Sequence, residues 1–274
     1  MISILTEKNK IVSVVDPDAK IAHKSPGNIK RGYKDHIIVD EDSEIILASV
    51  QTPFNVGDEK KLVELIEKTE CELGLKPEEI TTDKVYGTMD NRAYLKDKEI
   101  ISNIAFYNES SREVKFYGLR DFNISEDLLA VTCPNGITTN DYAITKNKVN
   151  NTDFKTFKFD KIICQKCPLK DQCLYQDKNG KVASKGRRLD VPLRYDAWLN
   201  DLKRVETQEF KEASNKRYKV ERRFATMVRN HGLRQCRYVG LGREKIHITL
   251  ANMACNIVRM VNILCQPSLA VLKN

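Results

Sequence analysis

The pattern of apolar and polar positions divides the first hundred residues into short strands and helices. Residues 11–15, 33–39 and 44–50 are apolar runs rich in β-branched residues, and the acidic turn 40–43 joins the last two. These runs predict a strand followed by a hairpin, with the polar, Gly- and Pro-containing stretch 23–32 between them. In residues 58–75 leucine and isoleucine recur at helical spacing, and Gly74 lies near the end. That pattern predicts an amphipathic helix.

The next segments predict a layered α/β domain. Residues 79–85 are a strand candidate that carries Asp83, residues 91–98 a helix, and residues 99–106 another strand. The order strand, hairpin, helix, strand, helix, strand is typical of a mixed sheet covered by helices. The chain has 274 residues, of which 41% are apolar, enough for one substantial core but not for two. We therefore expect one main domain with an insertion.

The second half of the chain predicts an insertion and then helices. Between 107 and 192 the periodicity fades into short, lysine-rich segments, so we expect an insertion braced by metal and too poor in apolar residues to build its own core. Helices are predicted at 195–204, from Phe210 to His231, and at 246–264. In the last helix we expect five residues to pack on the sheet: Leu250, Met253, Ile257, Val261 and Leu264. The domains predicted are 1–106, 107–192 and 193–274.

The sequence argues against a membrane span and against export. Polar residues interrupt the long apolar run 246–264, and the run 11–15 is too short to cross a bilayer. The interruptions are His247, Asn252, Asn256 and Arg259. The first residues lack a basic segment followed by a long apolar one, so we expect a cytoplasmic protein.

The positive charge of the chain is concentrated in one segment. The chain carries +8, and residues 215–245 alone hold ten basic residues against Glu221 and Glu244, so the rest is neutral. The basic residues are Lys216, Arg217, Lys219, Arg222, Arg223, Arg229, Arg234, Arg237, Arg243 and Lys245. A localised basic block suggests a polyanionic partner, because neutralising phosphates releases counterions. A solvated helix face is the other interpretation.

Four of the eight cysteines form a cluster with metal-ligand spacing. Cys164 and Cys167 make a CxxC pair, Cys173 follows, and Cys133 lies upstream in TCPNG. Four thiolates can close a tetrahedral structural Zn²⁺ site with no position left for chemistry. A redox pair or plain thiols remain alternatives. We expect the other cysteines to be buried, small apolar residues.

Two acids stand out by their positions. Asp83 ends a predicted strand, where α/β sheets often hold ligands, although a strand-end Asp is more often a cap. Glu221 is surrounded by basic residues, and Arg217 precedes it by four, so an ordinary salt bridge is the structural alternative. Carboxylates brought together beside phosphate-binding cations are what two-metal phosphodiester chemistry requires.

Several segments resemble, in their residues and in their order along the chain, segments of the DDE transposases of bacterial insertion sequences. The matching stretches include VVDPDAK, RGYKDHIIVDEDSEII, TPFNVGD, TTDKVYGTMDNRAYL, TCPNG with CQKCPLKDQC, KRYKVERRFATMVRNHGLRQCRYVGLGR and ITLANMACNIVR. They cover nearly the whole chain. The DKxYGT and VERRF…GLxxCRYxGL blocks together are the specific ones.

This resemblance implies a ribonuclease H-like fold and DNA transposition by metal-dependent cleavage and strand transfer. Asp83 corresponds to the second catalytic Asp and Glu221 to the final Glu, and together they would bind Mg²⁺ or Mn²⁺. Arg217 falls where relatives often have a basic signature residue, while Ser214 stands where they have a signature tyrosine. Phosphate contacts are implied for Arg217, Lys219, Arg222, Arg223, Arg229, Arg234 and Arg237. DNA is the implied partner, and the family's habit of dimerisation allows a homodimer.

The chain departs from the family pattern at the first catalytic Asp. In complete members that residue lies on the first sheet strand, after a helical DNA-binding region, and neither precedes residue 11 here. Asp16 is a weak candidate for it. We therefore expect an N-terminally truncated catalytic domain. An inactive remnant that only binds DNA and a ribonuclease H-like nuclease are the alternatives.

Overall fold

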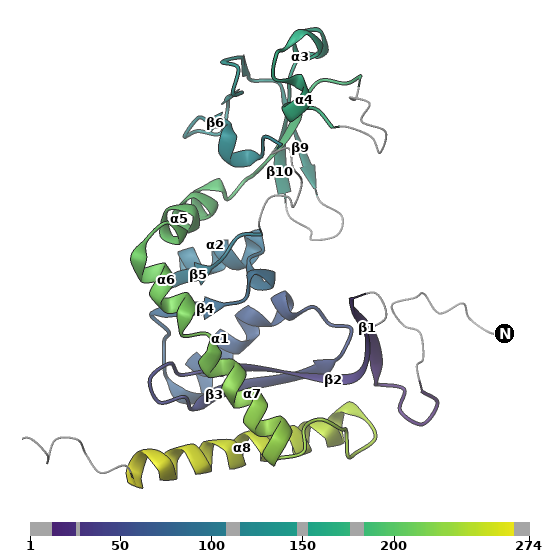
Figure 1. The fold of residues 1–274 in the computed structure, drawn as a ribbon, viewed down its shortest axis with the longest axis vertical. Helices are drawn as coiled ribbons and strands as arrows, with labels where there is room; N and C mark the ends of the chain where they lie inside the picture. Colours follow the sequence, from purple (N-terminus) through teal and green to yellow (C-terminus); the bar gives the residue numbers. More distant parts are fainter. Residues whose placement is uncertain (1–12, 26–27, 108–115, 147–152, 176–183, 266–274) are drawn as a thin grey trace, which may run out of the picture. The chain divides into compact units, whose positions relative to one another are not determined.

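The computed structural model describes residues 13–25, 28–107, 116–146, 153–175 and 184–265. Its contacts divide the chain into two compact units (Figure 1). Unit 1 consists of residues 1–104 and 204–274, and unit 2 of residues 105–203. Each unit is described by itself.

Unit 1 begins with an antiparallel sheet in the order β1-β2-β3. Its strands are β1 (Lys20–Ser25), β2 (Asn28–Val39) and β3 (Ile46–Pro53). Tyr33 pairs with Pro53 and Ile38 with Ala48, which confirms the predicted hairpin. On β3 every second residue from Ile46 to Val50 is buried, as expected for a strand with one face in the core.

The first predicted strand is wrong where it can be checked. Ser13, Val14 and Val15 form a bend, and both valines are exposed; residues 11 and 12 lie outside the described part of the chain. The strand β1 forms instead at residues 20–25, extending into the stretch we took to be polar connection. The residues of β1 are mostly polar, so no apolar pattern predicts a strand there. The strand is stabilised by pairing with β2, as between Lys20 and Gly32.

A βαβ unit follows the hairpin. The helices η2 (Asp58–Lys61) and α1 (Leu62–Leu73) lead into it, and it consists of β4 (Glu79–Thr82), η3 (Lys84–Tyr86), α2 (Met89–Asp97) and β5 (Ile101–Ile104). The predicted helix of residues 58–75 is confirmed, and Gly74 ends it with φ of 65°, a left-handed conformation that suits glycine. Strands β4 and β5 pair in parallel over a core of apolar side chains. That core is Leu62, Ile66, Leu95, Ile100 and Ile104.

The strands of unit 1 form two hydrogen-bonded sheets rather than one. Among the described residues, β1-β2-β3 is antiparallel and β4-β5 is parallel, with no ladder joining them. The α/β class that we predicted is correct, whereas the single mixed sheet is not present as one hydrogen-bonded ladder.

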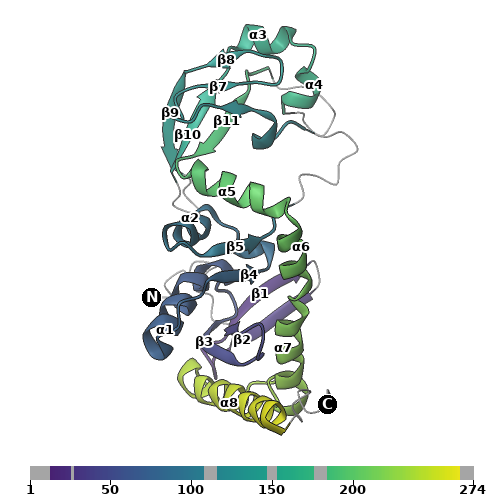
Figure 2. The same ribbon diagram turned by 90° about the vertical axis from the view of Figure 1, so that its left-hand side faces the viewer.

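Helix α5 (Tyr195–Val205) starts in unit 2 and ends in unit 1. Three helices of unit 1 follow it: α6 (Gln208–Asn215), α7 (Tyr218–Asn230) and α8 (Leu241–Cys265). The helix predicted from Phe210 is divided at Lys216 and Arg217, which connect α6 to α7. His231 caps α7, and Gly232 follows with φ of 72°. Figure 2 shows α6 and α7 running along one side of the unit 1 strands.

Helix α8 presents a different face to the sheet from the one predicted. Leu250, Met253, Ile257, Val261 and Leu264 are each at least half exposed, so their expected packing on the sheet is wrong. The buried side chains are Glu244, His247, Ile248, Ala251, Asn252 and Cys255. Hydrogen bonds select this face: the Asn256 amide both donates to the carbonyl of Ile46 and accepts from its N–H, satisfying the backbone of an edge strand.

By length and composition, α8 could cross a membrane. A single helix of this kind is weak evidence for a span, because core helices pass the same test. The polar residues that interrupt its apolar run bind the rest of unit 1: Asn252 donates to Asp35, and Arg259 donates to the carbonyl of Ser43.

Unit 2 is built from small sheets and short helices. A ladder of β6 (Asn123–Ile124), β7 (Val131–Thr132) and β8 (Thr138–Thr139) is accompanied by a sheet of β9 (Tyr142–Lys146), β10 (Asp153–Lys158) and β11 (Arg188–Pro192). The helices are η4 (Leu119–Asp121), α3 (Lys161–Lys166) and α4 (Lys170–Cys173). Contrary to our expectation, the unit has a small core. The buried side chains include Phe122, Val131, Phe157, Phe159, Leu189 and Val191.

Candidate metal and nucleic-acid site

Asp83 lies at the carboxyl end of β4, where the chain leaves the parallel pair. Its backbone is extended and its carboxylate accepts a hydrogen bond of 2.8 Å from the N–H of Lys84, so it caps η3. Asp83 therefore has the capping role that the sequence left open as an alternative. The cap uses one oxygen, and the side chain remains 57% exposed, so the carboxylate is accessible to a ligand.

Glu221 reaches the same place from the opposite end of the sequence. Helix α6 packs against β4 and β5, and α7 continues from it, so the first turn of α7 comes close to the end of β4. Arg217 lies one turn before Glu221, and its guanidinium is 3.6 Å from Glu221 Oε1 and 3.6 Å from Asp83 Oδ1. The ordinary i, i+4 salt bridge thus exists, but the same cation also contacts the strand-end acid.

The surroundings of the pair are acidic on the β4 side. Burial, together with the charges of Asp58, Asp83 and Glu59, raises the pKa of Tyr86 to about 12. Lys34 is 2.7 Å from Asp58 and offsets part of that negative charge. A region that combines accessible carboxylates with one bridging arginine favours cations.

A third acid does not join the pair. Asp16, the candidate for a first catalytic Asp, accepts hydrogen bonds from the Tyr33 hydroxyl at 2.7 Å and from the N–H of Ala19 at 3.3 Å. In the described parts of the chain, no three His, Cys, Asp or Glu side chains are grouped so that they could hold a metal ion. Asp83 and Glu221 therefore share Arg217 as a partner, with no third acid grouped beside them in the described residues.

Glu44 holds α7 and α8 against the hairpin, a role that no local sequence pattern indicated. The residue is buried in the β2–β3 turn with φ of 59°, and its carboxylate forms ion pairs with Arg222, Arg223 and Arg259. Arg223 is only 12% exposed and lies 3.1 Å from Glu44. A carboxylate that satisfies several guanidinium groups fixes the position of α7, and through it that of Glu221.

The basic residues predicted to contact phosphates therefore fall into two sets. Arg222 and Arg223 are paired with Glu44, and the ammonium of Lys219 donates to the carbonyl of Glu41 at 2.7 Å. Arg217 is occupied by the two acids. Three others are exposed and have no ion-pair partner within the described residues: Arg229, Arg234 and Arg237.

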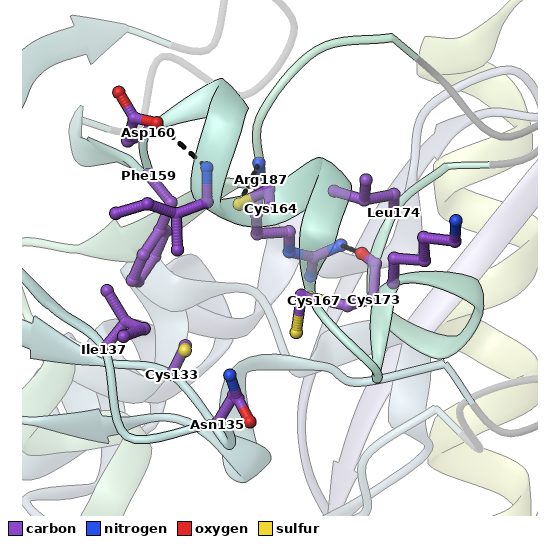
Figure 3. Close-up of a pocket in the computed structure, with 12 residues that line it drawn as sticks. Cys133, Asn135, Ile137, Phe159, Asp160, Cys164, Cys167, Cys173, Leu174 and Arg187 are labelled. Carbon is purple, nitrogen blue, oxygen red and sulfur yellow. Dashed lines mark hydrogen bonds between the residues drawn. The ribbon is translucent and has the colours of Figure 1, made fainter.

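The four clustered cysteines line one pocket of unit 2 (Figure 3). Cys133 follows β7, Cys164 and Cys167 flank the end of α3, and Cys173 ends α4. All four are free thiols. Burial raises the pKa of the Cys164 thiol, and the neighbouring thiols of Cys133 and Cys167 raise it further. The structure thus brings the predicted four side chains to one place.

Arg187 lies in the same pocket and was not anticipated from the sequence. Its backbone N–H donates to Cys164 Sγ at 3.5 Å, and its guanidinium donates to the carbonyls of Cys173 and Tyr117 at 2.8 Å each. The N–H of Leu169 donates to Cys167 Sγ at 3.4 Å. Donors directed at sulfur atoms stabilise thiolates, which are the form that binds metal.

The other four cysteines do not behave as one buried group. Cys255 is buried, as expected, whereas Cys71, Cys236 and Cys265 are exposed, so the expectation of burial is wrong for these three. Cys71 and Cys265 lie on the solvent side of α1 and α8.

The two groups of side chains differ in the kind of metal ion that their donor atoms suit. Four thiols suit zinc, although the described side chains are not grouped as a metal site. Two carboxylates suit a hard divalent cation, and the guanidinium of Arg217 at present lies within ion-pair distance of both.

Comparison with protein families identifies the C-terminal part of this architecture. Residues 132–261 match the family described as transposase DDE domain. The matched range contains the cysteine pocket, Glu221 and most of α8, while Asp83 lies before it. No curated protein and no solved structure matched the chain. Transposase DDE domains generally use divalent metal ions and act on DNA. Over residues 132–261 the chain is therefore similar to the transposase DDE domain family, which relates this part of it to DNA transposition.

Proposed function

We propose that the chain performs DNA transposition chemistry at the carboxyl end of β4, with Asp83 and Glu221 as its catalytic acids. The observation that carries the proposal is the arrangement around Arg217: acids 138 positions apart in sequence lie within 3.6 Å of one guanidinium. A site that holds one organic cation between two exposed carboxylates has the charge and donors to hold a divalent cation.

The residues would act as follows. Asp83 and Glu221 would hold the divalent cation, which would supply Lewis acidity for phosphodiester cleavage. Asp83 is fixed by its cap on η3, and Glu221 by the Glu44 contacts of α7. Arg217 would have to release the two carboxylates for them to hold a cation, and its charge would then be available to a DNA phosphate.

DNA would bind mainly through the exposed arginines. Arg229, Arg234 and Arg237 combine exposure with the lack of an acidic partner among the described residues, so they offer the least costly phosphate contacts. Arg222 and Arg223 would have to give up Glu44 first, which assigns them a structural role.

Zinc would brace the cysteine pocket of unit 2. Cys133, Cys164, Cys167 and Cys173 would be its ligands, and the N–H groups of Arg187 and Leu169 would support the thiolates. We also infer a ribonuclease H-like catalytic domain from residues 1–106 and 193–274, a cysteine-rich insertion at 107–192, and a cytoplasmic location.

A protein that binds DNA without cleaving it is the second candidate. It is favoured by the absence of a third acid beside Asp83 and Glu221 in the described residues, and by the hydrogen bonds that hold Asp16 at Tyr33. Two carboxylates bind a metal ion less tightly than three, so activity would be low or absent.

The deciding experiment measures Mn²⁺ binding and DNA chemistry with the full chain. The variants are Asp83→Asn and Glu221→Gln, and Asp90→Asn is the matched control because Asp90 is an exposed acid in the first turn of α2. Free Mn²⁺ is followed by electron paramagnetic resonance. We expect each test variant to weaken binding at least about tenfold and the control to match the wild type.

The DNA assay separates the candidate functions. A plasmid that carries the ends of the element is incubated with the wild type and Mg²⁺ or Mn²⁺. Cleavage followed by strand joining supports the transposase, cleavage alone indicates a nuclease, and binding without either indicates the noncatalytic protein. Unchanged Mn²⁺ affinity in both test variants would refute the assignment of Asp83 and Glu221.

A further inference from the structure

Helix α8 exposes a continuous apolar face that none of the described residues of unit 1 covers. Its nine large apolar side chains are between 39% and 82% exposed. They are Ile246, Leu250, Met253, Ile257, Val258, Met260, Val261, Ile263 and Leu264. In Figures 1 and 2 the labelled elements of unit 1 lie on one side of α8. Soluble monomers rarely leave an apolar surface of this length exposed.

The helix cannot rotate to bury this face. Its opposite side is bound to the hairpin by Asn252, Asn256 and Arg259, which bond to Asp35, Ile46 and Ser43. Turning α8 would break these bonds and leave buried polar groups without partners, a cost of roughly 1–3 kcal/mol each. The apolar face is therefore a fixed feature of the folded unit.

The spacing of the exposed residues is that of a helix-pairing seam. Residues 246, 250, 253, 257, 260 and 264 are separated by four, three, four, three and four positions. This is the a/d spacing at which one helix packs along another with knobs in holes. The occupant that fits this stripe is a second helix.

The stripe is also self-complementary. Its intervals read the same in both directions, so an antiparallel copy places Ile246 opposite Leu264, Leu250 opposite Met260, and Met253 opposite Ile257. A two-fold interface requires this kind of match, in which the same patch faces itself.

The size of the face suits a dimer. Nine apolar side chains that each expose about half of their surface offer roughly 700 Å² per copy, close to the roughly 800 Å² per partner of a standard interface. A helix that lies on a membrane carries Lys and Arg on its polar face, whereas the polar face of α8 is engaged with the hairpin.

We propose that a second copy of the chain docks on α8, with the two α8 stripes packed antiparallel. The inference depends on α8 alone and stands apart from the chemistry proposed for Asp83 and Glu221. It assigns a role to the face that sequence reasoning placed against the sheet.

The test measures the mass of the full chain by light scattering over a range of concentrations. The variants Leu250→Glu and Ile257→Glu place a charge in the middle of the stripe, and both residues are exposed, so folding should be preserved. Leu73→Glu is the matched control, because Leu73 is a half-exposed leucine on α1. Circular dichroism checks that each variant is folded.

We expect a dimeric wild type and control, and a dissociation constant raised about 30-fold or more by each α8 variant. The double variant Met253→Lys with Ile257→Glu should regain affinity relative to Ile257→Glu alone, because the antiparallel arrangement sets the new charges opposite each other. A monomeric wild type, a dimer unaffected by both α8 variants, or a double variant without recovery would each overturn the proposal. So would a monomer that binds phosphatidylcholine vesicles through α8.

Discussion

Asp35 is a half-buried acid whose charge should weaken the fold at neutral pH. It lies on β2 under α8, where burial raises its pKa to about 6 despite hydrogen bonds from Asn252 and Gln51 that lower it. The bonds are 2.9 Å and 2.8 Å long. Replacing it with asparagine keeps the shape of the side chain and removes the charge.

The magnitude follows from the difference in pKa between the folded and unfolded states. An ordinary aspartate titrates at 3.8 and Asp35 at about 6, so ionisation costs the folded state about 3 kcal/mol at 1.36 kcal/mol per pH unit. Because the folded pKa is the higher one, the favourable contribution is fully present below pH 4. It is lost as the pH rises to 6 and stays lost above that value.

The hydrogen bonds of the site can be kept in the variant. The side-chain oxygen of Asn252 is buried and has no partner among the described residues, while its nitrogen donates to Asp35. If the Asn252 amide turns over, its oxygen can accept from the new amide of Asp35→Asn, and Gln51 can still donate to the new carbonyl. The number of bonds is then unchanged.

The assay is urea unfolding followed by circular dichroism at several pH values between 4 and 8. We expect Asp35→Asn to match the wild type at pH 4 and to exceed its free energy of unfolding by about 3 kcal/mol above pH 6. Asp40→Asn is the control with opposite sign, because hydrogen bonds from Ser43 lower the pKa of Asp40. A variant less stable than the wild type at pH 7.5, or a difference independent of pH, would refute the reasoning.

Three further predictions concern the ion pairs, the thiols and the exposed arginines. Glu44→Gln should lower the free energy of unfolding by about 3 kcal/mol in the same assay, because it removes the charge that pairs with Arg223, whose side chain is only 12% exposed, and a cost under 1 kcal/mol would contradict this role. Purified wild type should contain about one zinc per chain and Cys167→Ser clearly less by metal analysis; retention of zinc after replacement of all four pocket cysteines would exclude the site. Arg229→Gln should weaken DNA binding and reduce its salt slope by about one, measured by fluorescence anisotropy, whereas Arg223→Gln should leave the slope unchanged. Equal loss of slope in both would contradict the division of the arginines.

Local patterns in the sequence were sufficient for the hairpin, for α1 and for the four cysteines as a group. Alternation along 33–39 and 44–50, helical spacing in 58–75 and the left-handed end at Gly74 each depend on residues a few positions apart. Periodicity reports the local preference for helix or strand, and in these segments the tertiary contacts stabilise the same secondary structure.

The strand at Lys20–Ser25, the division between α6 and α7, and the buried face of α8 were decided by tertiary structure. The Asn256 side chain meets the backbone of Ile46 across 210 positions, and Arg222 and Arg223 meet Glu44 across nearly as many. Apolar residues encircle much of α8, so its sequence permits more than one inner face. Only the positions of polar partners on the hairpin select which face is buried, because an unpaired polar group in the core costs more than an exposed leucine.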